Sequence, residues 1–180
     1  MLYNLTITKP YEHILPVWQE ILYSQSEDFY LRKSEATDGM ILDVREEQSD
    51  TFDPSDTDTC IRMHAGLNLL TPMNYALFYK EDLLLLITVM AAAQKVGEIS
   101  FLVDKKFVTA DPKVKLMLLR AFNKALPELP FYRLQAKVKN TFEAANKFVL
   151  AMNFKPEGNL EGYGGQGVDY TMYSRICTKE

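Results

Sequence analysis

The stretch "ANKFVLAMNFKPEGNL" (residues 145–160) contains the sharpest boundary in the sequence. An apolar helical pattern runs into Asn153 and Phe154, and Lys155-Pro156-Glu157-Gly158 then breaks it. Asparagine tolerates the left-handed backbone conformation in which many helices end. The pattern therefore predicts a helix that closes at Asn153, followed by a strand in which Phe154 packs inward.

A strand and a capped helix are predicted just before this boundary. "FYRLQAKVK" (131–139) alternates between apolar and polar residues, as a strand does. Asn140 is then expected to cap the helix, and Glu143 three positions later would complete a capping box. The expected inner face of this helix consists of Phe142, Ala145, Val149 and Met152.

Another helix is predicted to begin at Asp111-Pro112, with aspartate as the N-cap and proline at the first helical position. Pro127 and Pro130 are expected to end it, because proline cannot continue a helix. Its apolar residues recur at helical spacing and form a predicted buried stripe: Val114, Leu118, Ala121, Phe122 and Ala125.

The remaining pattern is mostly that of strands. Apolar or alternating runs predict strands at 2–7, 74–80, 83–90, 97–103 and 168–176. One more helix is expected after Pro10, with its apolar face formed by Ile14, Trp18, Ile21 and Leu22. Residues 24–38 are polar with weak periodicity, and no element is predicted there. Strands that alternate with amphipathic helices indicate an α/β sheet with helices packed on it.

Composition narrows the functional classes. The chain has 180 residues, of which 47% are hydrophobic and 24% charged, which fits one globular domain over 1–180. The net charge of −4 offers no basic field for nucleic acid. The longest apolar run, 83–93, is shorter than the roughly 20 residues that span a bilayer, so no membrane partner is expected. The two cysteines lie far apart, and we expect a cytoplasmic protein with reduced thiols.

Residues 43–59, "DVREEQSDTFDPSDTDT", carry seven acidic residues and one arginine. The segment is interpreted as a solvated loop, or alternatively as a surface for a basic partner. It is not an EF-hand, because the central glycine and the closing glutamate of that calcium loop are missing.

Two other patterns are misleading. "GYGGQG" (162–167) has the spacing of a dinucleotide fingerprint, but it precedes a strand instead of opening a helix, so we interpret it as a hairpin loop. Cys60 and His64 are only two groups and cannot complete a zinc site. No metal site is expected.

From "YRLQAKV" through Asn140, the following helix, "NF" and "EGNL", the sequence resembles the C-terminal half of the Gcn5-related N-acetyltransferase (GNAT) superfamily. The subgroup that acetylates ribosomal proteins and other protein N-termini is most similar. "VDYTMYSR" (168–175) resembles the family's last strand. Residues 97–177 follow the family order, 1–30 are compatible with it, and 31–73 are divergent. The resemblance implies a single domain with a mixed, mostly antiparallel sheet flanked by helices.

The resemblance also implies acetyl-CoA as cofactor. In the family, a glycine-containing loop after the strand that corresponds to 97–103 binds the pyrophosphate through backbone N–H groups at a helix N-terminus. Here the first loop position falls on Val108, and the two glycine positions fall on Asp111 and Lys113. The Asp111 carboxylate is expected to satisfy the N–H groups itself, and Pro112 lacks the donor.

Other groups can compensate for the missing glycines. Lys105, Lys106, Lys113 and Lys115 could supply positive charge, or could simply be solvated. The family holds the pantetheine arm on main-chain groups corresponding to residues 100–103, and its asparagine between strand and helix contacts the cofactor. The cofactor-binding residues that the resemblance implies are Phe101, Leu102, Val103, Lys113, Val114, Lys115 and Asn140.

Amine acetylation needs a base for the amine and an acid for the leaving thiolate. Glu98 is near the position of the family's base, although a glutamate there can also be merely exposed. The family's tyrosine acid falls on Val149, which has no proton to give. Tyr163 is our candidate for the acid, and Tyr170 and Tyr173 are alternatives.

Two functions follow from the sequence. The first is an acetyl-CoA-dependent N-acetyltransferase whose acceptor is an amine, either a protein N-terminus or a lysine. The second is a catalytically degenerate protein of the same fold that binds and modulates another protein, such as a phage protein that acts on a host protein. The sequence determines neither the acceptor nor the oligomeric state.

Overall fold

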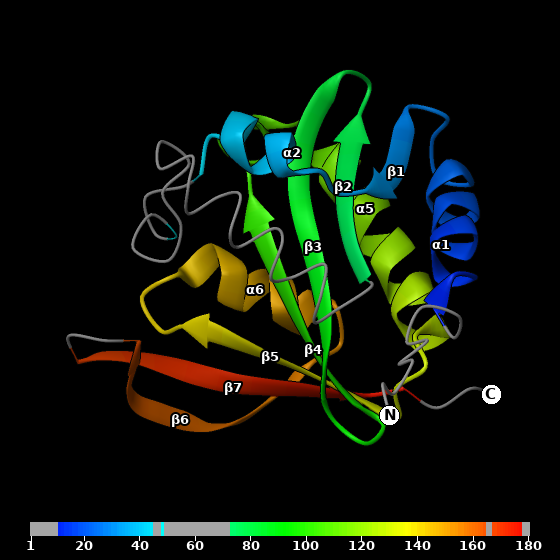
Figure 1. The fold of residues 1–180 in the computed structure, drawn as a ribbon. Coiled ribbons are helices and arrows are strands. Elements are labelled where there is room, and N and C mark those ends of the chain that lie inside the picture. Colours follow the sequence, from blue (N-terminus) through cyan, green and yellow to red (C-terminus); the bar gives the residue numbers. More distant parts are fainter. Residues whose placement is uncertain (1–10, 45–47, 49–72, 165–166, 178–180) are drawn as a thin grey trace, which may run out of the picture.

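The computed structural model describes residues 11–44, 48, 73–164 and 167–177. These residues form one seven-stranded sheet in the order β1-β2-β3-β4-β5-β7-β6 (Figure 1). The strands are β1 Phe29–Lys33, β2 Met73–Tyr79, β3 Asp82–Ala93, β4 Val96–Val103, β5 Arg133–Lys139, β6 Lys155–Gly164 and β7 Val168–Ile176. Every neighbouring pair is antiparallel except β4 and β5, which are parallel. The predicted fold class, an α/β domain with a mixed, mostly antiparallel sheet, is confirmed.

Some predictions lie outside the described residues. These are the strand at 2–7, most of the acidic segment 43–59, and the pair Cys60 and His64. Within the described part of the chain, no helix is both long enough and apolar enough to cross a bilayer.

The helices are α1 Ile14–Tyr23, α2 Ala36–Ile41, α4 Lys105–Thr109, α5 Pro112–Ala125 and α6 Glu143–Ala151. α1 and α5 lie side by side on one face of the sheet (Figure 1). Trp18 joins them to the sheet, because its ring centroid lies 5.9 Å from that of Tyr75 on β2 and 6.2 Å from that of Phe122 on α5. A smaller apolar cluster on the other face contains Leu42, Val44, Ala76 and Leu83.

α5 follows its prediction closely. The Asp111 carboxylate accepts a hydrogen bond from Lys113 N at 2.7 Å, and Pro112 is the first helical residue. All of the residues in the predicted stripe are buried: Val114, Leu118, Ala121, Phe122 and Ala125.

The C-terminal boundary is also as predicted. Asn153 has φ +63°, the left-handed conformation expected where α6 ends. Phe154 is buried at 2% exposure in the main core cluster, and β6 begins at the next residue. Asparagine adopts this conformation at little steric expense, as expected from the sequence.

The predicted cap of α6 is wrong. The helix begins at Glu143 with Phe142 at the N-cap position, and no side chain caps it. Asn140 lies in the turn directly after β5, where its main-chain N–H donates to Asp169 O of β7. Its side chain therefore turns across the sheet, donating to Asn159 and accepting from Thr171.

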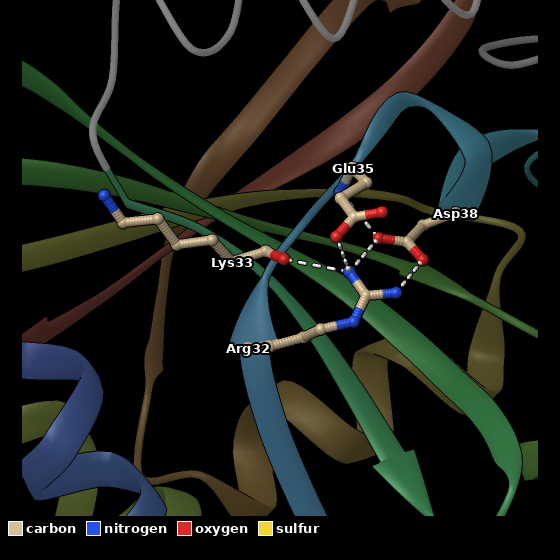
Figure 2. A network of polar contacts seen from close by, with 4 residues as sticks. All are labelled: Arg32, Lys33, Glu35 and Asp38. Carbon is tan, nitrogen blue, oxygen red and sulfur yellow. Dashed lines mark hydrogen bonds and ion pairs between the residues drawn. The ribbon is translucent and has the colours of Figure 1, made fainter.

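β1 and α2 lie in a stretch where the sequence predicted no element. An ion pair holds them together, as Figure 2 shows. The Arg32 guanidinium donates from both terminal nitrogens to the Asp38 carboxylate, at 2.8 Å and 2.5 Å. Asp38 is only 1% exposed and also accepts from Glu35 N at the start of α2. β1 also buries Phe29 and Leu31 in the main core cluster, but this alternation is too short to stand out in the sequence, and the ion pair that joins β1 to α2 has no periodic pattern.

Glu157 attaches β6 to the neighbouring β7 and, across it, to β5. Its carboxylate accepts hydrogen bonds from the Arg133 guanidinium on β5 and from the Ser174 hydroxyl on β7. The hydrogen bonds from Arg133, and then that from Ser174, lower the pKa of Glu157 to about 2.

Replacing Asp38 with alanine should destabilise the protein by about 2–4 kcal/mol, because it leaves the Arg32 charge without its buried partner. Urea unfolding gives this free energy. As the matched control, Asp82→Ala removes the partner of Lys106 in an exposed ion pair and should cost less than about 1 kcal/mol. Equal losses for the two variants would show that the Arg32–Asp38 pair contributes no more than a surface pair.

The contribution of Glu157 should depend on pH with a defined sign. Because its folded pKa is depressed, its stabilisation is fully present above about pH 4.5 and is lost as the pH falls towards about 2. The difference in unfolding free energy between the unmodified protein and Glu157→Gln should therefore shrink across that window. A difference that stays constant from pH 6 to pH 2 would contradict this account.

Candidate functional site

The parallel strands β4 and β5 form a fork. Only Val96–Glu98 of β4 pairs with Arg133–Gln135 of β5, whereas β4 continues to Val103. At the base of the fork the packing is tight, since a Cβ atom on Gly97 would lie 2.6 Å from the ring of Phe131. Beyond Glu98, that edge of β4 no longer pairs with β5.

A cavity of about 720 Å³ lies in the fork. Its apolar wall comes from β4, α4, α5 and α6. Phe148 is central to this wall, and its ring centroid lies 6.1 Å from those of Phe101 and Phe107. Val149, the position of the family's tyrosine acid, is 3% exposed and also lines the cavity. The wall suits an apolar chain and provides no hydroxyl at Val149.

The charged residues of the cavity all have the same sign. Among the described residues that line it, four are lysines and none is aspartate or glutamate: Lys115, Lys137, Lys139 and Lys147. The whole chain carries a net charge of −4. Positive charge is thus concentrated in the cavity of an acidic protein, which favours an anionic ligand.

The open edge of β4 presents main-chain groups towards a side-chain amide. Gln48 Nε2 donates to Phe101 O at 2.8 Å, and Gln48 Oε1 accepts from Val103 N at 3.1 Å. Gln48 also lines the cavity. A planar amide therefore already uses the pair of main-chain groups that an amide-containing ligand would use along this strand.

The loop before α5 differs from a phosphate-binding loop in the way the sequence indicated. The Asp111 carboxylate accepts a hydrogen bond from a main-chain N–H group at the start of α5. Two of the four candidate lysines are in ion pairs elsewhere, Lys105 with Asp43 and Lys106 with Asp82. Positive charge for a ligand would therefore come mainly from lysines that line the cavity. Two of these are themselves in ion pairs, Lys137 with Glu98 and Lys147 with Glu143.

The structure separates the predicted cofactor-binding residues into two groups. Phe101, Leu102, Val103 and Lys115 line the cavity. The Val114 side chain belongs to the main core, and Asn140 lines a smaller groove of about 310 Å³ beside α6. Lys113 lies in the first turn of α5 and does not line the cavity. The binding role of each residue stays a prediction.

The candidate base and acid meet through a residue that the sequence analysis did not single out. Lys137 Nζ lies 3.0 Å and 2.9 Å from the two carboxylate oxygens of Glu98, and it donates to Tyr163 Oη at 2.8 Å. Gln135 Nε2 donates to Glu98 as well, at 3.1 Å. Glu98, Lys137 and Tyr163, which we call the fork triad, come from β4, β5 and β6.

Electrostatics keep the Lys137 ammonium charged. Partial burial lowers the pKa of Lys137, but the hydrogen bonds with Tyr163 and Glu98 raise it by more, so the net pKa lies above the ordinary value. The ammonium therefore persists through the neutral pH range. The Tyr163 oxygen accepts from it, which leaves the phenolic hydrogen directed elsewhere and available for donation.

The alternative tyrosines lie in different places. Tyr170 lines the cavity, and its ring centroid is 5.4 Å from that of Tyr163. Gly164 permits this arrangement, because a Cβ atom there would lie 2.3 Å from the Tyr170 ring. Tyr173 points away from the fork and donates to Asn146 on α6.

Lys137 could have been singled out from one signal. The alternation of β5 places Gln135 and Lys137 on the same face of the strand. The contact of Lys137 with Glu98, however, depends on which residue of β4 lies opposite Gln135. Its contact with Tyr163 depends on the register of β6. Neither register is visible in the sequence.

The fold is similar to those of solved acetyltransferases. The ribosomal L7/L12 α-N-protein acetyltransferase RimL in complex with coenzyme A superposes with a TM-score of 0.64 at 16% identity, over 84% of this chain and 96% of that chain. A Salmonella typhimurium acetyltransferase that modifies the N-terminal serine of L7/L12 gives 0.66 at 16% identity, over 86% and 98%. The putative acetyltransferase yncA of the same species, solved with acetyl-CoA, gives 0.59 at 12% identity, over 85% and 96%.

No protein-family model matches the sequence. No curated protein matches it either. The likeness is thus one of structure, spread over most of the chain, at identities too low to carry residue roles across. The seven-stranded sheet with its forked β4 and β5 shows that this chain has the fold of the GNAT acetyltransferases.

Proposed function

We propose that this protein is an acetyl-CoA-dependent N-acetyltransferase whose acceptor is an amine, on a protein N-terminus or a lysine side chain. One observation carries the proposal. The cavity in the β4–β5 fork combines an apolar wall with four lysines and no acidic residue among its described lining, within a chain of net charge −4. Coenzyme A is complementary to such a cavity, because it joins an extended arm with amide groups to several phosphates.

The residues present fit that ligand in two parts. Lys115 and Lys147 would hold phosphates, since Lys147 is largely exposed at the cavity rim and Lys115 lies on the second turn of α5. The main-chain groups of Phe101 and Val103 would hold the amide-containing arm once their hydrogen bonds with the Gln48 amide are broken. Acetyl-CoA, when bound, supplies an activated acetyl thioester.

The fork triad provides the proton-transfer groups. The Glu98 carboxylate would accept a proton from the acceptor amine, and the Tyr163 hydroxyl would donate one to the leaving group. An ammonium group at the position of Lys137 Nζ donates to the Tyr163 oxygen, so the remaining phenolic hydrogen points away from that ammonium. In this proposal Tyr163 would supply the hydroxyl that Val149 lacks, although of the fork triad only Lys137 lines the cavity.

Acetyl-CoA titrated by calorimetry should bind with micromolar affinity. Lys115→Glu and Lys147→Glu should each weaken binding by about tenfold, because each reverses a charge in the cavity. The matched control is Lys155→Glu on β6, an exposed lysine outside the cavity, which should change the affinity less than twofold. The absence of heat at millimolar acetyl-CoA would refute the proposal.

A second candidate is a protein of this fold without catalysis that binds another protein, such as a bacterial host protein. It is favoured by a specific observation, the Asp111 carboxylate that already fills the N-terminus of α5 where the family binds phosphate. Lys105 and Lys106, which could have compensated, are held by Asp43 and Asp82.

Asp111→Gly distinguishes the two candidates. Glycine is also a tolerated N-cap, so the variant should lose only a few tenths of a kcal/mol of stability. If the unmodified protein binds acetyl-CoA, the variant should bind about three- to tenfold more tightly, because a negative charge leaves the helix start and Lys113 N is exposed. Binding that occurs only in the variant would support the second candidate.

A further inference from the structure

The fork triad holds a primary ammonium group by three kinds of contact. Lys137 Nζ forms an ion pair with both carboxylate oxygens of Glu98, at 3.0 Å and 2.9 Å. It donates to Tyr163 Oη at 2.8 Å. It also lies 4.9 Å from the centroid of the Tyr163 ring, within the range of a cation–π contact.

These contacts are partly shielded from water. The side chains of Lys137 and Glu98 are each only 21% exposed, so their attraction is screened less than that of a surface pair. Gln135 on β5 faces Glu98 with a neutral amide, and Tyr170 on β7 faces Tyr163 with an aromatic ring.

The groups that receive the ammonium are positioned independently of it. Glu98 is the last residue of β4 paired with β5, and Gln135 Nε2 donates to its carboxylate at 3.1 Å. The Tyr163 ring rests against Tyr170, which Gly164 allows to lie close to the backbone of β6. Truncation of Lys137 would therefore leave a carboxylate and a phenol still facing the same point.

We propose that Glu98 and Tyr163 form a binding site for a primary alkylammonium group, which Lys137 fills in this structure and which an acceptor amine enters by displacing Lys137. The ammonium site stands on the geometry alone, whereas its use by the acceptor rests on the proposed acetyltransferase function. A lysine side chain and a protein N-terminus share the required chemistry.

The contacts select a primary ammonium over other cations. Its N–H groups can donate to the carboxylate and to the phenolic oxygen at once, which a quaternary ammonium cannot do. Since Lys137 is tethered beside the site, it competes at a high effective concentration. The acceptor should therefore bind weakly to the unmodified protein, and removal of the Lys137 side chain should tighten its binding.

The test uses Lys137→Ala and n-propylammonium chloride, whose three carbons and nitrogen replace Cγ, Cδ, Cε and Nζ of the lost side chain. The variant should melt below the unmodified protein. Propylammonium should then raise its Tm saturably, by roughly 3–5 °C at tenfold excess over a half-saturating concentration on the order of 10 mM. The unmodified protein should show no such rise, because Lys137 already fills the site.

Three control solutes separate recognition from ionic strength and from non-specific effects. Sodium chloride and tetramethylammonium chloride supply the same charge without N–H donors, and 1-propanol supplies the same chain without charge. The double variant Glu98→Gln/Lys137→Ala removes the receiving carboxylate and should lose the response to propylammonium. A rise in Tm that is equal for all four solutes, or that persists in the double variant, would overturn the proposal.

A second variant covers the case in which Lys137→Ala does not fold. Lys137→Met keeps an unbranched side chain that lacks only the terminal nitrogen, so ammonium chloride becomes the matching probe. A saturable rise in Tm above that in sodium chloride supports the site, and its absence overturns it.

These measurements use no acetyl-CoA, so their outcome does not depend on whether the proposed function is correct. Rescue by propylammonium in a protein that binds no acetyl-CoA would keep the ammonium site and remove its use in acetylation. Acetyl-CoA binding without rescue would overturn the ammonium site and leave the proposed function standing.

Discussion

Two parallel strands that start as neighbours can separate only where other groups satisfy the main-chain atoms that they leave behind. In this protein β4 and β5 separate after Glu98 and Gln135. The cavity, its apolar wall and the open edge of β4 all result from that separation. The fork triad also depends on it, because Glu98 marks the last paired position and Lys137 reaches back to it from the diverging strand. The tight packing of Phe131 against Gly97 fixes the point from which the two strands diverge.

The net charge of the chain hides how charge is distributed around the cavity. Lysines from β5, α5 and α6 line one space, although the chain as a whole is acidic. The loop before α5 carries negative charge instead, because the Asp111 carboxylate accepts a hydrogen bond at the helix N-terminus. Under the proposed function, phosphate affinity would come from side-chain charge and not from this helix N-terminus. Side chains placed on separate elements give less directional binding than a row of backbone N–H groups.

The fold could be predicted largely because its boundaries depend on local chemistry. Asp111 and Pro112 begin α5, and Asn153 ends α6, for reasons that involve only neighbouring residues. β1 and α2 were not predicted, because β1 buries only Phe29 and Leu31 and the Arg32–Asp38 pair that joins it to α2 leaves no periodic pattern. The cap assigned to Asn140 was wrong because α6 begins only at Glu143, and Asn140 instead forms hydrogen bonds with Asp169 and Thr171 on β7.

The candidate site was only partly visible in the sequence. Glu98 and Tyr163 could be selected because their types fit acid–base chemistry, but their separation along the chain is large. Lys137, which contacts both, looked like an ordinary polar residue on the outer face of a strand. Its position depends on the registers of three strands. A one-residue shift of any of them would place that strand's member of the fork triad on the opposite face of the sheet.

The hydrogen bonds from Gln48 to β4 also affect how the molecule behaves towards its own copies. An unpaired strand edge is a template on which another chain can add a strand, and proteins with exposed edges are prone to self-association. Here such an edge lies in the middle of the sheet, where β4 has lost its neighbour. The Gln48 amide has the planar geometry of a peptide group and satisfies Phe101 O and Val103 N in place of an adjoining strand. A strand from another molecule must first displace the Gln48 amide. The side chain that satisfies Phe101 O and Val103 N therefore also protects this edge of the sheet against the addition of another strand.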